Sequence, residues 1–383
     1  MSQGGTRYGR GVAALEKSKR QHLELCLTLH RAVASGGGNS CFSPYSVASA
    51  LGLVSRAARG KAADELINLL AGSDEELTRQ AELLLGASTL REDRGREKPV
   101  LAVSNTLWAW DQLPLNDEFQ DELAGWPGGR VESAPFVSDP EQARQVINAD
   151  VAEITRNLIP ELLEPGMIAP DAVASLVNAL YLKAGWIHPF PEDRTEREDF
   201  HSPGGTRRAL TMRQSEIFPY AARDGWQVVV LPGAGGTEAV VLLPDGDLAQ
   251  AEAGLDAAKL ARLLQEPHRT QVHLSMPKFD VDVRSPLTER LQELGVSEIF
   301  SPDADFTPLT PDPRLFVQDV VHQAVLRVGE QGFEGAAATA VTFRAVSMII
   351  AEPVTVEVNR PFLLLVRHSE TGVVYFFSRI VDP

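Results

Sequence analysis

Residues 328–351 read VGEQGFEGAAATAVTFRAVSMIIA, and this stretch decides the fold because it is patterned like a strand but composed like a loop. Among its alternate positions, one set holds the large aromatic residues Phe333 and Phe343. The other set holds the charged residues Glu334 and Arg344. This period of two is typical of a strand with one buried face, although the small residues in the middle have weak strand preference. One interpretation of this combination is a segment that is exposed in one state and a central strand in another.

Two simpler interpretations of the same stretch stay open on composition alone. Alanine is the best helix former, so residues 335–340 also fit an ordinary helix. Small residues equally suit a flexible connection between two strands. Composition by itself favours one of these two interpretations over a conformational switch.

The chain around this segment changes from helical to β-rich along its length. Ser43 is a natural N-cap, with Pro44 at the first position of the helix that follows. Helices first and strands later, without strict alternation, predict an α+β fold with mostly antiparallel sheets. No linker rich in Ser, Gly or Pro divides the chain, so we expect one domain over residues 1–383. The expected helices are residues 15–34, 47–59, 62–70, 139–158, 255–265 and 286–294, and the expected strands are residues 100–110, 173–177, 227–231, 239–243, 271–276, 354–358, 362–367 and 373–380.

The chain is acidic, with 36 basic and 52 acidic residues among 383 and a formal charge of −16 at pH 7. Nucleic acids, anionic membranes and heparin-like polyanions are bound mainly through Lys and Arg, so this balance argues against all three as partners. The two cysteines, Cys26 and Cys41, lie in apolar stretches, where we expect free structural thiols. Residues 1–11 are polar and no stretch of 18 uncharged apolar residues occurs, so the sequence alone predicts a soluble, cytoplasmic chain.

Patterns of catalysis and metal binding are missing from the sequence. Neither G-x-S-x-G nor H-E-x-x-H occurs, and the phosphate-binding pattern fails because Ala62 follows Gly60 and Lys61. His268 and His273 are close together but have no neighbouring pattern of Cys or acidic residues for a metal. We therefore expect no catalytic residue, no metal and no cofactor. An esterase or other enzyme would rest only on Ser, His and Asp residues whose geometry a sequence does not show.

A family resemblance emerges from several segments in a fixed order. Residues 330–340, EQGFEGAAATA, resemble the hinge of the reactive centre loop in serpins, the serine protease inhibitors that trap their target by loop insertion. Six further segments resemble the same family in the same order: residues 39–46 (NSCFSPYS), 176–186 (LVNALYLKAGW), 276–279 (MPKF), 322–324 (HQA), 359–362 (NRPF) and 381–383 (VDP). The chain is therefore identified as a member of the serpin family, of prokaryotic type.

The resemblance implies a fold and a mechanism. It implies a single domain with three β-sheets, eight to nine helices and an exposed reactive centre loop at about residues 330–352. It further implies that a chymotrypsin- or elastase-like serine protease attacks the loop and forms an acyl-enzyme, and that the cut loop then inserts into the large sheet and traps it. We expect a monomer with no cofactor, which would be extracellular if it follows the family's habit.

The resemblance also assigns roles to individual residues. The position of the family's cleaved bond corresponds best to Val346-Ser347 in this chain. Cleavage at Phe343, Arg344 or Met348 is the alternative. The loop hinge comprises Glu330, Gly332, Phe333, Glu334, Gly335, Ala336, Ala337, Ala338 and Thr339. A polar cluster that controls the parting of the strands comprises Ser43, Ser46, Asn178 and His322, and the point of loop insertion carries Trp186 and an ion pair between Lys278 and Glu330.

Two residues of the hinge depart from the family's pattern. Phe333 stands where a small Ser or Thr is usual, so we expect slower insertion of a bulky ring. Gly335 replaces the usual Ala and would loosen the hinge in compensation. Phe333 therefore also raises an alternative, a non-inhibitory serpin that acts as a binding protein or chaperone.

Overall fold

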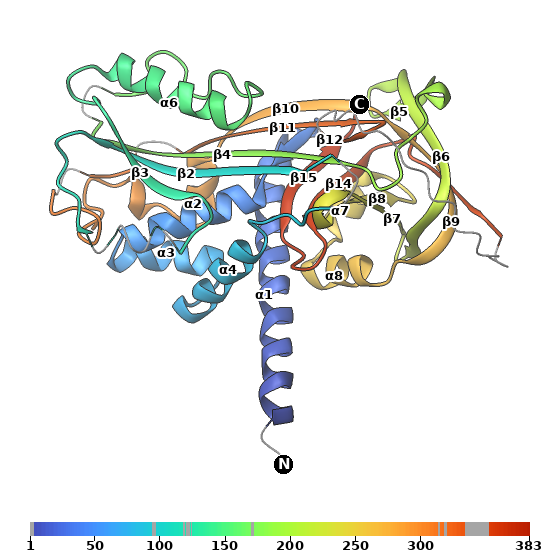
Figure 1. The fold of residues 1–383 in the computed structure, drawn as a ribbon, viewed down its shortest axis with the longest axis horizontal. Coiled ribbons are helices and arrows are strands. Elements are labelled where there is room, and N and C mark those ends of the chain that lie inside the picture. The colour runs from blue at the N-terminus through green and yellow to red at the C-terminus, as the bar shows by residue number, and fades with distance from the viewer. Residues whose placement is uncertain are drawn as a thin grey trace.

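The computed structural model describes residues 4–93, 97–117, 119, 123, 125–169, 172–312, 315–317, 320–333 and 352–383. The strands in these ranges form two hydrogen-bonded sheets, and helices cover both faces of the smaller sheet (Figure 1). This architecture is the α+β fold that the sequence predicts.

Eight α-helices lie within the described residues, and their ends follow the sequence signals. Ser43 has an extended backbone and its Oγ accepts a hydrogen bond from the amide of Ser46, so α2 begins where predicted. Asp139 caps α6 in the same way through the amide of Gln142. None of the helices described is both long and apolar enough to cross a membrane. The helices are α1 (Gly4–Val33), α2 (Pro44–Ala57), α3 (Gly60–Leu70), α4 (Asp74–Gly86), α6 (Pro140–Ile154), α7 (Leu248–Ala253), α8 (Ala257–Gln265) and α9 (Thr288–Glu293).

The smaller sheet has six strands in the order β10-β11-β12-β4-β2-β3. Most neighbours are antiparallel, and β2 and β3 are parallel. The predicted strand over residues 100–110 is confirmed as β2, and the predicted strand over residues 173–177 is the start of the longer β4. The strands are β2 (Val100–Trp110), β3 (Gly129–Ala134), β4 (Ala174–Gly185), β10 (Phe279–Pro286), β11 (Val321–Gly329) and β12 (Gly332–Phe333).

The larger sheet has nine strands, in the order β1-β15-β14-β8-β7-β6-β9-β13 with β5 paired to β6. Two of the three expected sheets are continuous here, because the 19-residue strand β6 pairs with β7 at one end and with β9 and β5 along the rest. The strands are β1 (Ser40–Phe42), β5 (Glu196–Ser202), β6 (Gly205–Arg223), β7 (Trp226–Pro232), β8 (Thr237–Pro244), β9 (His268–Pro277), β13 (Val354–Glu357), β14 (Phe362–His368) and β15 (Val374–Ile380).

The six-stranded sheet separates two clusters of buried side chains. Along β4, Leu182 and Ala184 belong to the larger cluster, whereas Val177 and Ala179 belong to the smaller one. The larger cluster is shared with α2 to α4 and the nine-stranded sheet, and the smaller one with α6. In Figure 1, α6 lies on one side of the sheet and α2, α3 and α4 lie on the other. A strand that pairs with β4 is therefore covered on both faces.

Both cysteines are free and buried, as their apolar surroundings predict. Burial raises the pKa of the Cys41 thiol to about 12, so this thiol is protonated at neutral pH. Ser378 Oγ lies 3.2 Å from the sulfur. Cys26 and Cys41 thus contribute to the core as small apolar side chains.

Candidate functional site

The two-residue strand β12 lies between two long strands, β11 and β4, at one end of the six-stranded sheet. Phe333 pairs with Val328 of β11 on one side and with Ala184 of β4 on the other. Only glycine fits at position 332, because a Cβ on Gly332 would lie 2.2 Å from the carbonyl oxygen of Ala184. The first residues of the expected inserting segment are thus already part of the sheet.

The side chain of Phe333 is fully buried, with 0% of its surface exposed. Its ring meets that of Trp186 edge to face, with 5.2 Å between the ring centroids. The indole nitrogen of Trp186 donates a hydrogen bond of 2.9 Å to the carbonyl of Gly329, which orients the indole. Gly233 leaves the space beside them, because a Cβ there would come within 3.3 Å of Phe333. The ring of Phe333, which we expected to slow insertion, is already buried in this structure.

An ion pair holds the turn that leads into β12. Lys278 Nζ lies 2.9 Å from Glu330 Oε2, so the expected ion pair is present. Thr195 Oγ1 donates a second hydrogen bond to this carboxylate at 3.0 Å. Burial acts to raise the pKa of Glu330, but the hydrogen bonds from Lys278 and Thr195 help to hold that pKa below its usual range. The carboxylate is therefore charged at neutral pH.

Three of the four residues expected to control strand parting are joined by hydrogen bonds. The amide of Ser43 donates to Nε2 of His322 at 2.9 Å, and the amide of Ser46 donates to Oγ of Ser43 at 3.1 Å. The fourth residue, Asn178 of β4, donates instead to the side chain of Asn105 in β2. Asn105 was missed at the sequence level, although an amide in the middle of an apolar strand signals a buried polar partner.

His322 is neutral within this cluster. Its ring is buried, and that burial lowers its pKa to about 4. Because Nε2 accepts the hydrogen bond from the amide of Ser43, the single ring proton is on Nδ1. The cluster therefore carries dipoles but no charge at neutral pH.

Two side chains of the cluster have polar atoms without a partner among the described residues. These atoms are Oγ of Ser46 and Oδ1 of Asn178, and both are buried. A buried polar atom that makes no hydrogen bond costs about 1–3 kcal/mol. The cluster can therefore gain hydrogen bonds when another polar side chain approaches.

The other residues of the expected loop lie outside the described residues. They are Glu334, Gly335, Ala336, Ala337, Ala338 and Thr339 of the hinge, and Phe343, Arg344, Val346, Ser347 and Met348 around the expected bond. Within the ranges that the structure describes, no group of three or more His, Cys, Asp and Glu side chains is placed to hold a metal ion.

The chain resembles known proteins over most of its length. Residues 20–383 match the family described as Serpin (serine protease inhibitor). A serine protease inhibitor of Rattus norvegicus is 32% identical over 90% of this chain and 83% of its own length. An uncharacterized serpin-like protein of Thermococcus kodakarensis is 29% identical over 93% of this chain and 83% of its own. A thyroxine-binding globulin, solved in complex with thyroxine, shares the fold with a TM-score of 0.83 at 24% identity, covering 95% of this chain and 99% of that one.

Proposed function

Because this chain belongs to the serpin family of serine protease inhibitors, we propose that it inhibits a chymotrypsin- or elastase-like serine protease as a suicide substrate. The protease cleaves between Val346 and Ser347 and forms an acyl-enzyme through Val346. Residues 334–343 then enter the six-stranded sheet between β4 and β11 and carry the protease to the far end of that sheet. Residues 1–383 act as one domain in this proposal, because the inserting loop and the sheet that receives it belong to the same unit.

The position of β12 carries the proposal, because it sets the register in which the loop would continue. Gly332 pairs with Gly185, the last residue of the 12-residue strand β4. Continuing this antiparallel ladder one residue at a time brings Phe343 opposite Ala174, the first residue of β4. Residues 332–343 thus match β4 along its whole length, and no proline interrupts them.

The same register supports burial of the apolar set of loop residues. Phe333 and Ala184 lie directly opposite each other and both belong to the larger buried cluster. Alternate residues of a strand share a face, so the later members of this set would point into the same cluster. These members are Gly335, Ala337, Thr339, Val341 and Phe343.

The other set of loop residues suits the opposite face of the sheet. One step beyond Phe333, Glu334 would lie between Lys183 of β4 and Arg327 of β11. Opposite charges on neighbouring strands are favourable by roughly 0.2–1 kcal/mol. The alternate alanines of residues 336–340 would follow on this face, which carries the smaller buried cluster that includes Val177 and Ala179 of β4.

Thr339 would meet the polar cluster in the middle of the sheet. Six residues beyond the pair of Phe333 and Ala184, it comes opposite Asn178 on β4 and His322 on β11. Its hydroxyl can donate to Oδ1 of Asn178, a buried acceptor without a partner among the described residues. Insertion would thus supply a hydrogen bond in addition to buried apolar surface.

The expected bond lies just beyond the last paired position. Arg344, Ala345 and Val346 would connect the end of the inserted strand to the acyl bond. The short apolar side chain of Val346 suits the primary pocket of an elastase-like enzyme. Cleavage after Phe343 or Met348 would instead indicate a chymotrypsin-like target, and cleavage after Arg344 a trypsin-like one.

The test is a mixture of the protein with elastase, chymotrypsin or trypsin, followed by boiling in SDS and electrophoresis. We expect a covalent complex with elastase or chymotrypsin and, where the bond Val346-Ser347 is cut, a released fragment whose N-terminal residue is Ser347. Thr339→Arg would place a charge on the face of the inserted strand that points into the larger buried cluster. The loop of this variant should therefore be cleaved without forming a complex. Leu85→Arg, at an exposed position of α4, should behave like the unsubstituted chain. Cleavage of the unsubstituted chain without any complex contradicts the proposal.

A non-inhibitory serpin that binds a ligand or acts as a chaperone is the alternative that Phe333 raises. In a non-inhibitory serpin, the cleaved form would melt at nearly the same temperature as the uncleaved form. The similar thyroxine-binding globulin was solved with thyroxine, which gives binding a precedent in this fold. The match in length between residues 332–343 and β4 favours the inhibitor, because a loop that never enters the sheet would not require this match.

A further inference from the structure

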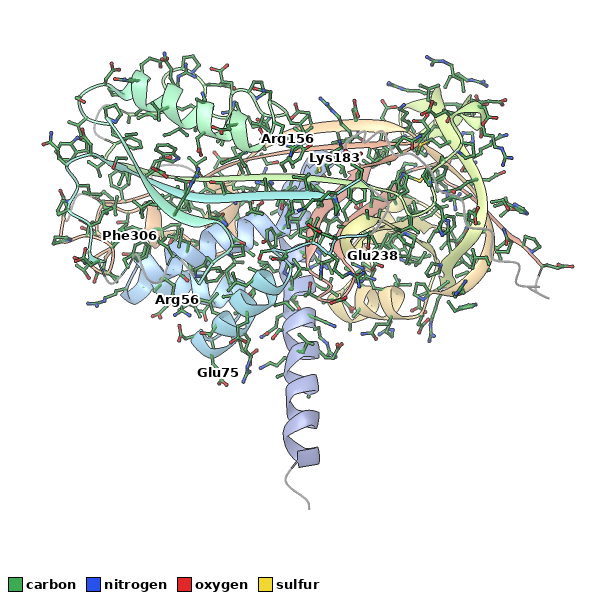
Figure 2. The ribbon with its side chains drawn as sticks, viewed as in Figure 1. Arg56, Glu75, Arg156, Lys183, Glu238 and Phe306 are labelled. Atoms are coloured by element: carbon green, nitrogen blue, oxygen red, sulfur yellow. The ribbon has the colours of Figure 1, made fainter. Side chains whose placement is uncertain are left out.

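A cavity of about 70 Å³ lies at the far end of the six-stranded sheet from β12. Ala174 and Leu176, near the start of β4, line one side of it together with Leu107 of β2. Phe306 and Leu309, from the segment ahead of β11, also line it. Figure 2 shows Phe306 at this end of the molecule, with Lys183 of β4 well removed from it.

The chemistry of the lining decides what this cavity accepts. One water molecule needs about 10–15 Å³ by a comparable measure, so the volume exceeds that of a single water several times. Water also needs polar partners, and the lining consists mostly of alanine, valine, leucine and phenylalanine side chains. The cavity therefore suits a hydrocarbon group better than solvent.

We propose that this cavity is the receptor for the phenyl ring of Phe343 in the inserted state. The inference rests on the proposed function, because the ring reaches the cavity only if residues 334–343 enter the sheet. Ten residues beyond Phe333, Phe343 comes opposite Ala174 and shares the face of Phe333. Ala174 and Leu176 are both lining residues of the cavity, so the register and the cavity identify the same place.

The neighbouring loop residue on the same face supports this assignment. Val341 would lie opposite Leu176, at the edge of the cavity, so the two largest apolar side chains that follow Phe333 on this face arrive together. Between Phe333 and Val341 the same face carries only Gly, Ala and Thr. Large apolar groups thus occur at both ends of the inserting strand, and the far end is where the cavity lies.

The position of the ring gives it a role in holding the trapped protease. Strand ends open more readily than strand centres, and Phe343 is the last residue that β4 can pair. A ring seated in the cavity would resist this opening three residues from the acyl bond at Val346. The ring thus anchors the end of the inserted strand on which the protease pulls.

Melting curves before and after loop cleavage test the anchor. Phe343→Ala should lower the melting temperature of the cleaved form by about 5 °C, because it removes a ring from an apolar site. The uncleaved Phe343→Ala and unsubstituted chains should melt together, and Phe343→Leu should recover part of the loss in the cleaved form. Equal melting of the cleaved Phe343→Ala and unsubstituted forms overturns the inference.

Fluorescence locates the side chain itself. On cleavage, the emission of Phe343→Trp, relative to the unsubstituted chain, should move to shorter wavelength and become protected from iodide. The matched control Ile350→Trp lies beyond the expected bond and should show neither change. A large rise in melting temperature on cleavage, with the Phe343→Trp indole still open to iodide, contradicts the anchor and leaves the proposed function intact. No rise in melting temperature on cleavage contradicts both.

Discussion

The two ends of the six-stranded sheet differ in what already fills the space beside β4. At the near end, β12 pairs with both neighbours and Phe333 packs against Trp186. At the far end, a cavity of about 70 Å³ borders Ala174 and Phe306. One end is therefore complete in this structure, whereas the other retains space that an added side chain can occupy.

This difference separates the interactions that start insertion from those that complete it. The ring of Phe333 is already buried in this structure, so it stabilises the form that precedes cleavage as well as the inserted form. A ring at position 343 would stabilise the inserted form alone. Residues at the near end should therefore set the stability of both forms, and residues at the far end should set the difference between them.

Phe333→Ala should have the largest effect on the uncleaved chain. Removing a fully buried phenyl ring costs about 3–5 kcal/mol of unfolding free energy, and we expect this loss in both the uncleaved and the cleaved form. Denaturant unfolding of the two forms measures it. A loss confined to the cleaved form would mean that β12 is not part of the sheet before cleavage. The near end of the sheet would then not be complete in the uncleaved chain.

Acid should weaken the middle of the sheet through His322. The unfolded chain binds a proton near pH 6.5, but the buried ring does so only near pH 4, so the unfolding free energy falls as the pH drops between these values. The loss approaches about 3 kcal/mol once the pH is below both values. His22, whose pKa burial also lowers to about 4, adds a similar loss.

His322→Gln separates the two contributions, because an amide oxygen can still accept the hydrogen bond from the amide of Ser43. When unfolding is followed at pH 7 and at pH 4, this variant should no longer show the part of the acid-dependent loss that is due to the His322 ring, about 3 kcal/mol. It should keep the part due to His22 and to other groups whose pKa is lowered, such as His368 and Glu330. An unchanged pH dependence in His322→Gln would show that the ring does not titrate as described.

Gly332→Ala should displace β12 from the sheet, with a moderate loss of unfolding free energy. Its Cβ would collide with the carbonyl oxygen of Ala184, so β12 must shift or leave the sheet. We expect a loss of about 1–3 kcal/mol and faster proteolysis of the uncleaved loop. Gly329→Ala, where a Cβ would meet only the end of the Lys278 side chain at 3.7 Å, is the matched control. Equal behaviour of the two variants would contradict the close packing of β12 against β4.

Lys278→Ala should have the smallest effect on stability. The lysine is 45% exposed, and ion pairs of this kind contribute about 0–1 kcal/mol. We expect a shift of the unfolding midpoint close to the limit of measurement, together with a changed rate of complex formation with the target protease. A loss well above about 1 kcal/mol would show that the turn at Glu330 contributes more to the sheet than its exposure indicates.

Local signals in the sequence predicted the elements well, because their causes lie within a few residues. Ser43 caps its helix through the amide of Ser46, three residues away, and β2 has the predicted bounds of residues 100–110. The merging of two expected sheets into one was not predictable in this way. It depends on β6 running for 19 residues past several different partners.

The candidate site was predicted residue by residue from the resemblance, but its packing was not. Burial of Phe333 depends on Trp186 and on the space left at Gly233, which are far from it in the sequence. The partner of Asn178 proved to be Asn105, because the register of β4 on β2 places the two amides side by side. Such contacts follow from the register and cannot be read from either segment alone.

The proposed inhibition requires that the cut loop inserts and traps the protease before the acyl bond is hydrolysed. The most direct measurement is denaturing electrophoresis of an equimolar mixture with elastase or chymotrypsin, read together with the residual protease activity. We expect a covalent complex that retains the protease, together with a residual protease activity close to zero. Complete cleavage of the loop with full protease activity and no complex would contradict it.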